Sequence, residues 1–275
     1  MKTLFRWMSA WPLPLLHAFG AVLGWLAFLA SPTYRRRFLA NAAQAGFRFA
    51  EVRPAVAAAG RLVVEAPRLW FGELPPVEWD DPALVERARA AGRGLLFLTP
   101  HQGGFESTAL GYAQRFGPIT VLYRPPRKAW LRGLVESART RPNVTAVPTN
   151  LAGVRQLLRT LRAGGTVGLL PDQVPPQGMG AWAPFFGRDA YTMTLAARLA
   201  RQTGAAVLLA RSERLPGGAG FRVHVTPWPG EPPAEAPEAA AAQVNACIED
   251  MVRACPGQYL WGYARYKEPR QEGPA

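Results

Sequence analysis

The hydrophobic residues of the chain follow three successive patterns. Between Trp7 and Tyr34 there is no Asp, Glu, Lys or Arg, and apolar residues occupy every side of a helix drawn through this segment. Residues 35–75 place their apolar side chains at helical spacing. Beyond residue 82, short apolar runs of strand length alternate with stretches of helix length. The chain therefore divides into an apolar N-terminal segment, a helical lead-in and an alternating main part.

The alternating part predicts the secondary structure of the main domain. Helices are expected over residues 84–94, 104–116, 128–140, 151–165, 192–204 and 237–255. Strands are expected over residues 94–99, 119–124, 144–149, 166–171, 205–214 and 221–227. Short apolar strands separated by helices are typical of a mostly parallel sheet with helices on both faces. The expected fold class is α/β, with a linker at 75–82, a loop at 172–191 and an edge segment at 258–266.

The N-terminal segment has the length and composition of a membrane helix. At about 1.5 Å per residue it is long enough to cross or deeply enter a hydrocarbon layer of about 30 Å. The arginines at 35–37 resist translocation, which favours an uncleaved anchor with the rest of the chain on the cytoplasmic side. We predict an anchor at 1–34 and a domain at 35–275, with a helical lead-in at 35–80 and an α/β core at 81–275. A cleaved signal peptide and a buried globular helix stay open, as does the choice between spanning the membrane and lying in it.

The charge of the chain indicates an anionic partner. It has 32 basic and 19 acidic residues, a formal net charge of +13, and the basic residues are spread through apolar sequence. Such a balance suits nucleic acid, an acidic protein or an anionic membrane surface. No recognisable nucleic-acid module is present, so nucleic acid is not expected. Cys247 and Cys255 match no metal-ligand spacing, and we expect neither a metal nor a cofactor.

Polar residues follow several of the predicted strands. His101 follows the first of these strands, Arg124 ends the second, and Asp172 and Gln173 follow the fourth. In open α/β sheets, ligands bind beyond the carboxyl ends of the strands. We therefore expect the functional site at this edge of the sheet.

His101 and Glu106 are the candidate acid–base pair. Histidine transfers protons near neutral pH, and a carboxylate bonded to its far ring nitrogen fixes its tautomer and stabilises its cationic form. The spacing of the pair across a strand-to-helix turn allows the two side chains to meet. Gly103 and Gly104 let the backbone approach a substrate carbonyl, so their N–H groups are candidate oxyanion donors. A purely structural His–Glu pair is the alternative.

Several motifs resemble one family. The sequence HQGGFE at 101–106 resembles the H-x4-E/D box of glycerolipid-type acyltransferases. YRPP (123–126), LLPDQ (169–173), APFFGRDAYT (183–192) and PGQYLWGYARYK (256–267) are similar, in order and spacing, to the lipid A late acyltransferase family. The resemblance covers nearly the whole chain. It departs from the family at Gly104-Phe105, where Asn-Trp is common, and this leaves the acceptor open.

The resemblance implies transfer of a fatty acyl group from acyl carrier protein to a hydroxyl of the lipid A precursor, an anionic lipid, at the bacterial inner membrane. His101 would act as the base and Glu106 as its partner, by direct attack and without a covalent acyl-enzyme. The residues expected to contact substrate or shape the site are Arg124, Asp172, Gln173, Phe185, Phe186 and Arg265. Two alternatives stay open: an acyltransferase for another membrane lipid, such as a phospholipid or an ornithine-type aminolipid, and a non-enzymatic basic binding protein.

Overall fold

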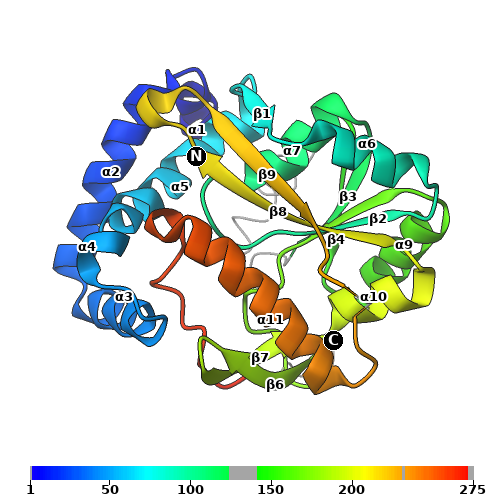
Figure 1. Cartoon of the computed structure of the whole chain (residues 1–275). Coiled ribbons are helices and arrows are strands. Elements are labelled where there is room, and N and C mark those ends of the chain that lie inside the picture. Colours follow the sequence, from blue (N-terminus) through cyan, green and yellow to red (C-terminus); the bar gives the residue numbers. More distant parts are fainter. Residues whose placement is uncertain (1, 124–140, 231–232, 272–275) are drawn as a thin grey trace.

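A seven-stranded sheet forms the centre of the molecule, with strand order β1-β9-β8-β2-β5-β3-β4 (Figure 1). The computed structural model describes residues 2–123, 141–230 and 233–271. Its strands are β1 (Val77–Trp79), β2 (Leu95–Leu98), β3 (Ile119–Tyr123), β4 (Val144–Pro148), β5 (Thr166–Leu169), β8 (Ala206–Arg214) and β9 (Phe221–Pro227). The neighbours β8, β2, β5, β3 and β4 are parallel, whereas β9 is antiparallel to β8. The prediction of a mostly parallel α/β fold is confirmed.

Helices cover both faces of this sheet. They are α6 (Pro82–Ala90), α7 (Glu106–Arg115), α9 (Leu151–Arg162), α10 (Leu195–Thr203) and α11 (Pro237–Ala254). Alternate residues of a strand point to opposite faces, and β2 follows this rule. Leu96 and Leu98 pack in one core with residues of α9, α10 and α11, whereas Leu95 and Phe97 pack in another with residues of α6 and α7. Because both faces of β2 are covered, its whole sequence is apolar.

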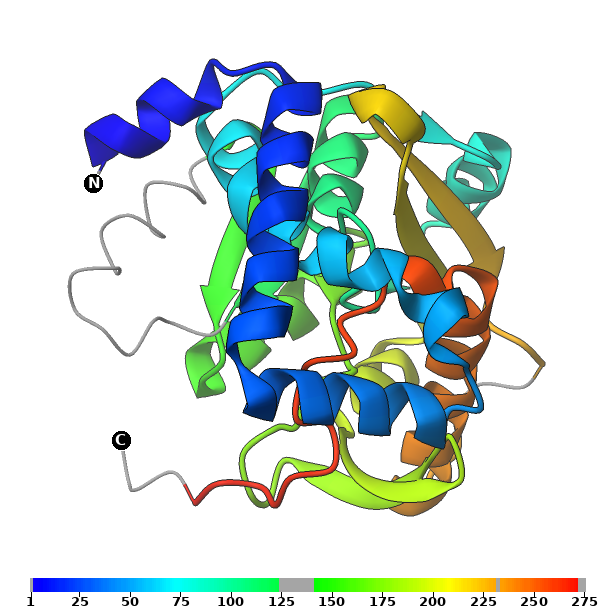
Figure 2. The ribbon, with the colours of Figure 1, turned by 90° about the vertical axis from the view of Figure 1, so that its left-hand side faces the viewer.

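The N-terminal helices stand at the end of the sheet toward which the parallel strands point (Figure 1). They are α1 (Lys2–Ser9), α2 (Leu13–Ala30), α3 (Pro32–Gln44), α4 (Phe49–Val52) and α5 (Pro54–Phe71). Figure 2 looks at this end of the molecule and shows α2 running along its front. By length and composition, α2 is a candidate membrane helix, with 33% of its residues buried in the protein. The expected apolar N-terminal helix is therefore present, and the division of the chain at residue 34 stays a prediction.

The helix α2 packs closely on α5. Added Cβ atoms at Gly20 and Gly24 would lie 2.6 Å from Arg61 Cα and 2.2 Å from Val56 O. Gly60 of α5 faces Gly24 in the same way, since a Cβ there would lie 2.4 Å from Gly24 N. These glycines let the two helix backbones approach each other directly, so α2 forms one wall of the domain.

Three segments differ from the sequence-based prediction. The expected loop at 172–191 contains a hairpin of β6 (Gly180–Phe185) and β7 (Arg188–Met193), which packs against α11. The strand β6 alternates buried and exposed residues, but the prolines and glycines of the segment 172–191 hid that pattern in the sequence. The expected linker at 75–82 contains β1, and the expected edge segment forms a single bridge between Gln102 and Tyr259. The helix predicted at 128–140 lies outside the described residues.

Candidate active site

His101 is bonded to a buried carboxylate at the carboxyl edge of the sheet. Its ring nitrogen Nδ1 lies 2.6 Å from Asp172 Oδ1, and its backbone N–H donates to Asp172 Oδ2 at 2.9 Å. The side chain of Asp172 is 2% exposed and that of His101 is 17% exposed. Both oxygens of Asp172 therefore hold His101, one through its ring and one through its backbone.

The register of two neighbouring strands explains this contact. Leu98 of β2 pairs with Leu169 of β5, and the Thr99 N–H donates to the Leu169 carbonyl. His101 and Asp172 each stand at the third position beyond the paired leucines, so the parallel strands deliver them side by side.

The buried carboxylate of Asp172 is kept ionised by its surroundings. Burial by itself raises the pKa of Asp172, but the charge of His101, its two hydrogen bonds and the charge of Arg265 outweigh burial, so the pKa lies below its ordinary value. Burial and the neighbouring Asp172 charge raise the pKa of Tyr259 well above its ordinary value. The Tyr259 hydroxyl thus stays protonated beside Asp172.

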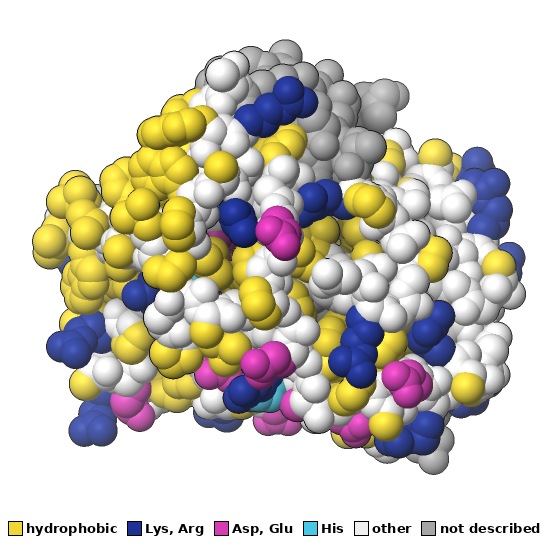
Figure 3. All heavy atoms as spheres, turned by 90° about the horizontal axis from the view of Figure 1, so that it is seen from above, with side chains coloured by type: hydrophobic (Ala, Val, Ile, Leu, Met, Phe, Trp, Pro, Cys, Tyr) yellow, Lys and Arg dark blue, Asp and Glu magenta, His cyan; other side chains and the backbone are white. Residues whose placement is uncertain are grey.

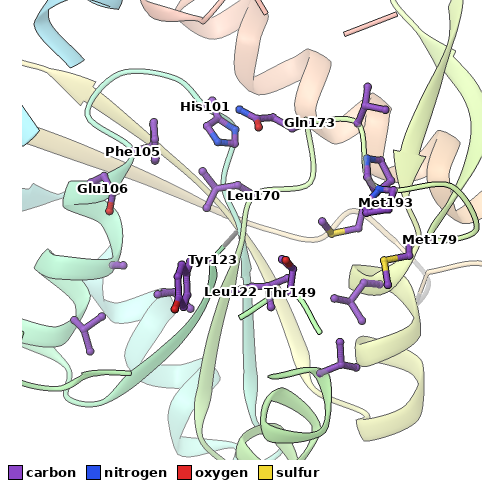
Figure 4. Close-up of a pocket in the computed structure, with 18 of the residues that line it drawn as sticks. His101, Phe105, Glu106, Leu122, Tyr123, Thr149, Leu170, Gln173, Met179 and Met193 are labelled. Carbon is purple, nitrogen blue, oxygen red and sulfur yellow. The ribbon is translucent and has the colours of Figure 1, made fainter. Parts of the chain in front are cut away.

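The predicted partner of His101 was Glu106, and the structure corrects this assignment. Glu106 is the first residue of α7 and lines the same cavity as His101. The Phe105 ring packs edge-on against the His101 ring at 4.7 Å between centroids, and Figure 4 draws Glu106 on the far side of Phe105. The ring nitrogen Nδ1 is bonded to Asp172 instead. Sequence spacing favoured the nearer carboxylate, whereas the strand register brings in one that is 71 residues away.

The two glycines of the turn have packing roles. The Gly103 N–H donates to the Gln258 carbonyl at 2.9 Å, so the donor that we predicted for an oxyanion is already bonded. Gly103 has φ +58°, and a Cβ there would overlap the Ser212 carbonyl oxygen. A Cβ at Gly104 would meet the Phe221 ring at 2.2 Å. Glycine at these positions lets the turn lie against β8 and β9, which corrects the oxyanion assignment for Gly103 and leaves that of Gly104 a prediction.

The C-terminal segment fixes the backbone around His101. The Leu260 N–H donates to the His101 carbonyl at 3.3 Å, and the Gln102 side chain donates to the Cys255 carbonyl at 2.8 Å. The Arg214 N–H donates to the side-chain oxygen of Gln258, and the side-chain amide of Gln258 donates to the Arg214 carbonyl. The turn is therefore clamped between β8 and the C-terminal segment.

A largely apolar cavity of about 370 Å³ opens beside His101 (Figure 4). Its apolar lining comes from α7, β3, α9, the segment after β5 and the end of β7, and includes Leu110, Val121, Leu122, Val154, Leu170 and Met193. His101, Glu106 and Gln173 also line it, so the structure brings together three of the predicted site residues. An apolar space with His101 in its lining and Asp172 bonded to that histidine suits a chain-like substrate with one reactive end. In the part of the chain that the structure describes, no group of three His, Cys or carboxylate side chains is arranged to hold a metal.

Among the described residues, the other predicted site residues do not line this cavity. Arg265 is 3% exposed and donates to the Tyr191 carbonyl, Thr192 Oγ1 and Asn245 Oδ1. Burial lowers its pKa, and its guanidinium lies 4.9 Å from the Phe185 ring centre. Phe185 and Phe186 are buried in the main core, because the hairpin folds back against α11. These three residues are buried and lie outside the cavity lining, which corrects their assignment to substrate. Arg124 lies outside the described residues.

Replacing Asp172 by Asn tests the electrostatics of the pair. Because the folded-state pKa of Asp172 is lowered, its charge stabilises the protein above the unfolded pKa of about 3.9. That contribution is lost as the pH falls through the lower folded pKa. We expect Asp172→Asn to reduce the free energy of unfolding by about 1–3 kcal/mol at pH 7, and by progressively less as the pH falls below 4.

Urea unfolding between pH 3 and pH 7 measures this difference. Asp189→Asn, at an exposed position of β7, is the matched control and should leave the unfolding free energy nearly unchanged. A loss for Asp172→Asn that stays constant over the whole pH range would contradict the electrostatic account.

Sequence comparison gives the chain clear relatives. A family model described as bacterial lipid A biosynthesis acyltransferase matches residues 3–268. The chain is 29% identical over 216 residues to the lipid A biosynthesis palmitoleoyltransferase of Escherichia coli (strain K12), covering 76% of this chain and 68% of that protein. It is 28% identical over 222 residues to the lipid A biosynthesis lauroyltransferase of the same organism, covering 78% and 70%. A lipid A biosynthesis acyltransferase of Haemophilus influenzae is 24% identical over 179 residues, covering 64% and 55%.

Proposed function

The chain belongs to the bacterial lipid A biosynthesis acyltransferase family, and we propose that it transfers a fatty acyl chain from acyl carrier protein to a hydroxyl of the lipid A precursor. The observation that supports this proposal most strongly is the His101–Asp172 pair at the rim of an apolar cavity. A base beside a hydroxyl acceptor and a space for a hydrocarbon chain are the two requirements of such a transfer.

His101 acts as the general base in this proposal. Its Nδ1–H donates to Asp172, which leaves Nε2 to accept the proton of the acceptor hydroxyl. The hydroxyl oxygen attacks the thioester carbonyl directly, and the bond from carbon to sulfur breaks. The proton on Nε2 passes to the departing thiolate of the carrier, so the products are an ester and a thiol. Asp172 stabilises the imidazolium between the two proton transfers.

Glu106 has a separate role in this proposal. It is a carboxylate in a mostly apolar lining, within the same cavity as His101. A carboxylate accepts hydrogen bonds, so Glu106 is suited to hold a hydroxyl of the acceptor while His101 removes the proton. The sequence predicted a pair of residues, whereas the proposed site has three: His101 is the base, Asp172 orients it and Glu106 contacts the acceptor.

Replacing His101 by Ala tests the base directly. General-base catalysis is worth about 10²–10⁴-fold, and we expect kcat to fall by that factor in a protein that still folds, although its thermal unfolding temperature should fall because the buried Asp172 carboxylate loses its ring partner. Transfer of a labelled acyl group from the carrier to the lipid A precursor is the measurement. His224→Ala, on β9 and outside the cavity lining, should keep the wild-type rate.

Two further variants separate the carboxylates in the same assay. Asp172→Asn should lower kcat strongly, because the ring loses its orientation and its counter-charge. Glu106→Gln should chiefly raise KM for the acceptor. A wild-type kcat for His101→Ala would refute the mechanism, and no transfer by the wild-type protein to any lipid acceptor would refute the function.

The apolar cavity is the proposed site for the acyl chain. Each buried CH₂ of an acyl chain contributes about 0.8 kcal/mol to binding. A larger side chain that fills part of the cavity should therefore weaken the binding of long acyl chains more than that of short ones. Val154 of α9 lines the cavity, and we expect Val154→Trp to lower kcat/KM for the longest acyl donors by about tenfold or more while sparing short ones.

A series of carriers loaded with acyl chains of increasing length measures this preference. Ala152→Trp places the same side chain at an exposed position of the same helix and should leave the length profile unchanged. An equal loss for every chain length in Val154→Trp would mean that the cavity does not hold the acyl chain.

The positive charge of the chain supports an acidic donor. With a net charge of +13, electrostatic attraction should speed the encounter with an acidic carrier protein, and salt screens that attraction. We expect KM for the acyl carrier protein to rise steeply between low and physiological ionic strength, with kcat little changed. A short synthetic acyl thioester is the control donor, and its KM should depend far less on salt. A KM for the carrier that does not respond to salt would contradict electrostatic docking.

A different membrane lipid is the second candidate acceptor. The departure from the family at Gly104-Phe105 supports this second candidate, because it directly precedes α7, whose residues Glu106 and Leu110 line the cavity. A panel of lipid A precursor, phospholipid and ornithine-type acceptors, tested with one carrier, distinguishes the candidates. In either case we propose that the protein works on the cytoplasmic face of the bacterial inner membrane.

A further inference from the structure

The helix α2 has one face buried against the protein and one exposed face. The buried face consists of Leu13, Leu16, His17, Gly20, Gly24 and Phe28. The exposed apolar face, which we call the α2 stripe, consists of Leu15, Phe19, Val22, Leu23, Leu26 and Leu29. Its members are between 36% and 63% exposed, and Leu4 and Trp7 of α1 are also exposed. A soluble protein rarely leaves so many large apolar side chains on one helix in water.

The buried face ties α2 to the domain by a charged cluster. His17 Nε2 lies 2.9 Å from Glu65 Oε2 of α5, and Glu65 is fully buried. Arg214 of β8 donates to both oxygens of Glu65, with Nε to Oε2 at 2.7 Å. Arg61 also donates to the His17 carbonyl at 3.3 Å. Detaching α2 would remove a hydrogen bond from a buried ion pair and leave the His17 side chain without its carboxylate.

The packing of α2 along α5 opposes a crossing of the bilayer. The domain lies directly behind α2, so a spanning α2 would take α5 and the edge of the sheet into the hydrocarbon. Arg61 and Arg68 of α5 would then lie at membrane depth, and a charged side chain there is costly. If α2 left α5 to cross alone, His17 would enter the hydrocarbon and the contacts at Gly20 and Gly24 would be lost.

A helix lying in the membrane surface avoids both costs. An interfacial helix inserts its apolar face about 5–10 Å into the boundary between headgroups and acyl chains. The α2 stripe has that character, and exposed arginines lie at both ends of the N-terminal unit, at Arg6 before α2 and at Arg36 and Arg37 after it. Basic side chains near the surface bind anionic headgroups. Figure 3 shows hydrophobic side chains gathered on the side of the molecule where α1 and α2 lie, with basic side chains around them.

We propose that α2 is a one-sided anchor that lies in the plane of the cytoplasmic leaflet and does not cross the membrane. The choice of membrane rests on the proposed function, whereas the orientation rests on the packing of α2. Trp70 at the end of α5 lines the substrate cavity, and Phe5 of α1 contacts Phe71 beside it, with ring centres 6.5 Å apart. The surface formed by α1 and α2 is thus continuous with a wall of the cavity. A lipid acceptor can therefore reach the site, and its acylated product can leave it, without leaving the interface.

The positions of the two chain ends test this orientation. A protease-cleavable epitope tag is placed before Met1 in one protein and after Ala275 in another, and each is expressed in bacterial membranes. An in-plane α2 puts both tags on the cytoplasmic side, so protease should remove both from inverted vesicles and neither from right-side-out vesicles. Removal of the N-terminal tag from right-side-out vesicles, with the C-terminal tag protected, would mean that α2 spans the bilayer and would overturn the proposal.

Binding to vesicles of phosphatidylethanolamine and phosphatidylglycerol tests the α2 stripe itself. Burying a leucine is worth about 1.5–3 kcal/mol, so Leu26→Glu should weaken binding by about tenfold or more. Leu151→Glu changes a residue of similar exposure on α9 and is the matched control. Equal binding by both variants would overturn the proposal.

Acyl transfer with a detergent-dispersed acceptor separates this inference from the proposed function. Leu26→Glu should retain near wild-type transfer in detergent, because Leu26 lies outside the cavity lining. A protein without transfer activity but with both tags on the cytoplasmic side would refute the function and leave the orientation standing.

Discussion

The hydrogen bond between His101 Nδ1 and the buried Asp172 carboxylate is the interaction on which the site depends. A histidine at a strand end has two ring nitrogens and several possible orientations, and this bond selects one of each. The second oxygen of Asp172 accepts the His101 backbone N–H, so the ring and its backbone are fixed by one side chain. The charge of Asp172 survives burial because His101 donates two hydrogen bonds to it and Arg265 supplies positive charge nearby. Removal of any member of this group would leave another buried polar side chain without its partner.

A second buried cluster connects α2 to the same turn. His17 of α2 contacts Glu65, Glu65 pairs with Arg214, and the backbone of Arg214 is bonded to the Gln258 side chain. The Gln258 carbonyl in turn accepts the Gly103 N–H, two residues after His101. Each contact links segments that are far apart in the sequence. The same set of bonds therefore connects α2 to the turn that carries His101.

The sequence was sufficient to predict the architecture but not the partner of the base. Apolar strands alternating with helices predicted the parallel sheet, and polar residues after those strands predicted the edge where His101, Glu106 and Gln173 meet. The bond to Asp172 depends on β2 and β5 being neighbours in the sheet, which the order of strands along the chain does not reveal. Burial of Arg265 depends on the hairpin folding back against α11, and a motif match cannot distinguish a charge beside substrate from a charge behind the site. The two faces of α2 were hidden because glycine, histidine and leucine all fit an apolar pattern, although only one face meets the protein.

The tautomer of His101 is the most direct test of this account. Nitrogen-15 NMR of the histidine side chains, assigned by comparison with His101→Ala, reports which ring nitrogen carries the proton in the neutral form. The account predicts a proton on Nδ1 and an unprotonated Nε2, with this preference lost in Asp172→Asn and kept in Glu106→Gln. A neutral His101 protonated on Nε2, or a preference that depends on Glu106 and not on Asp172, would contradict the account.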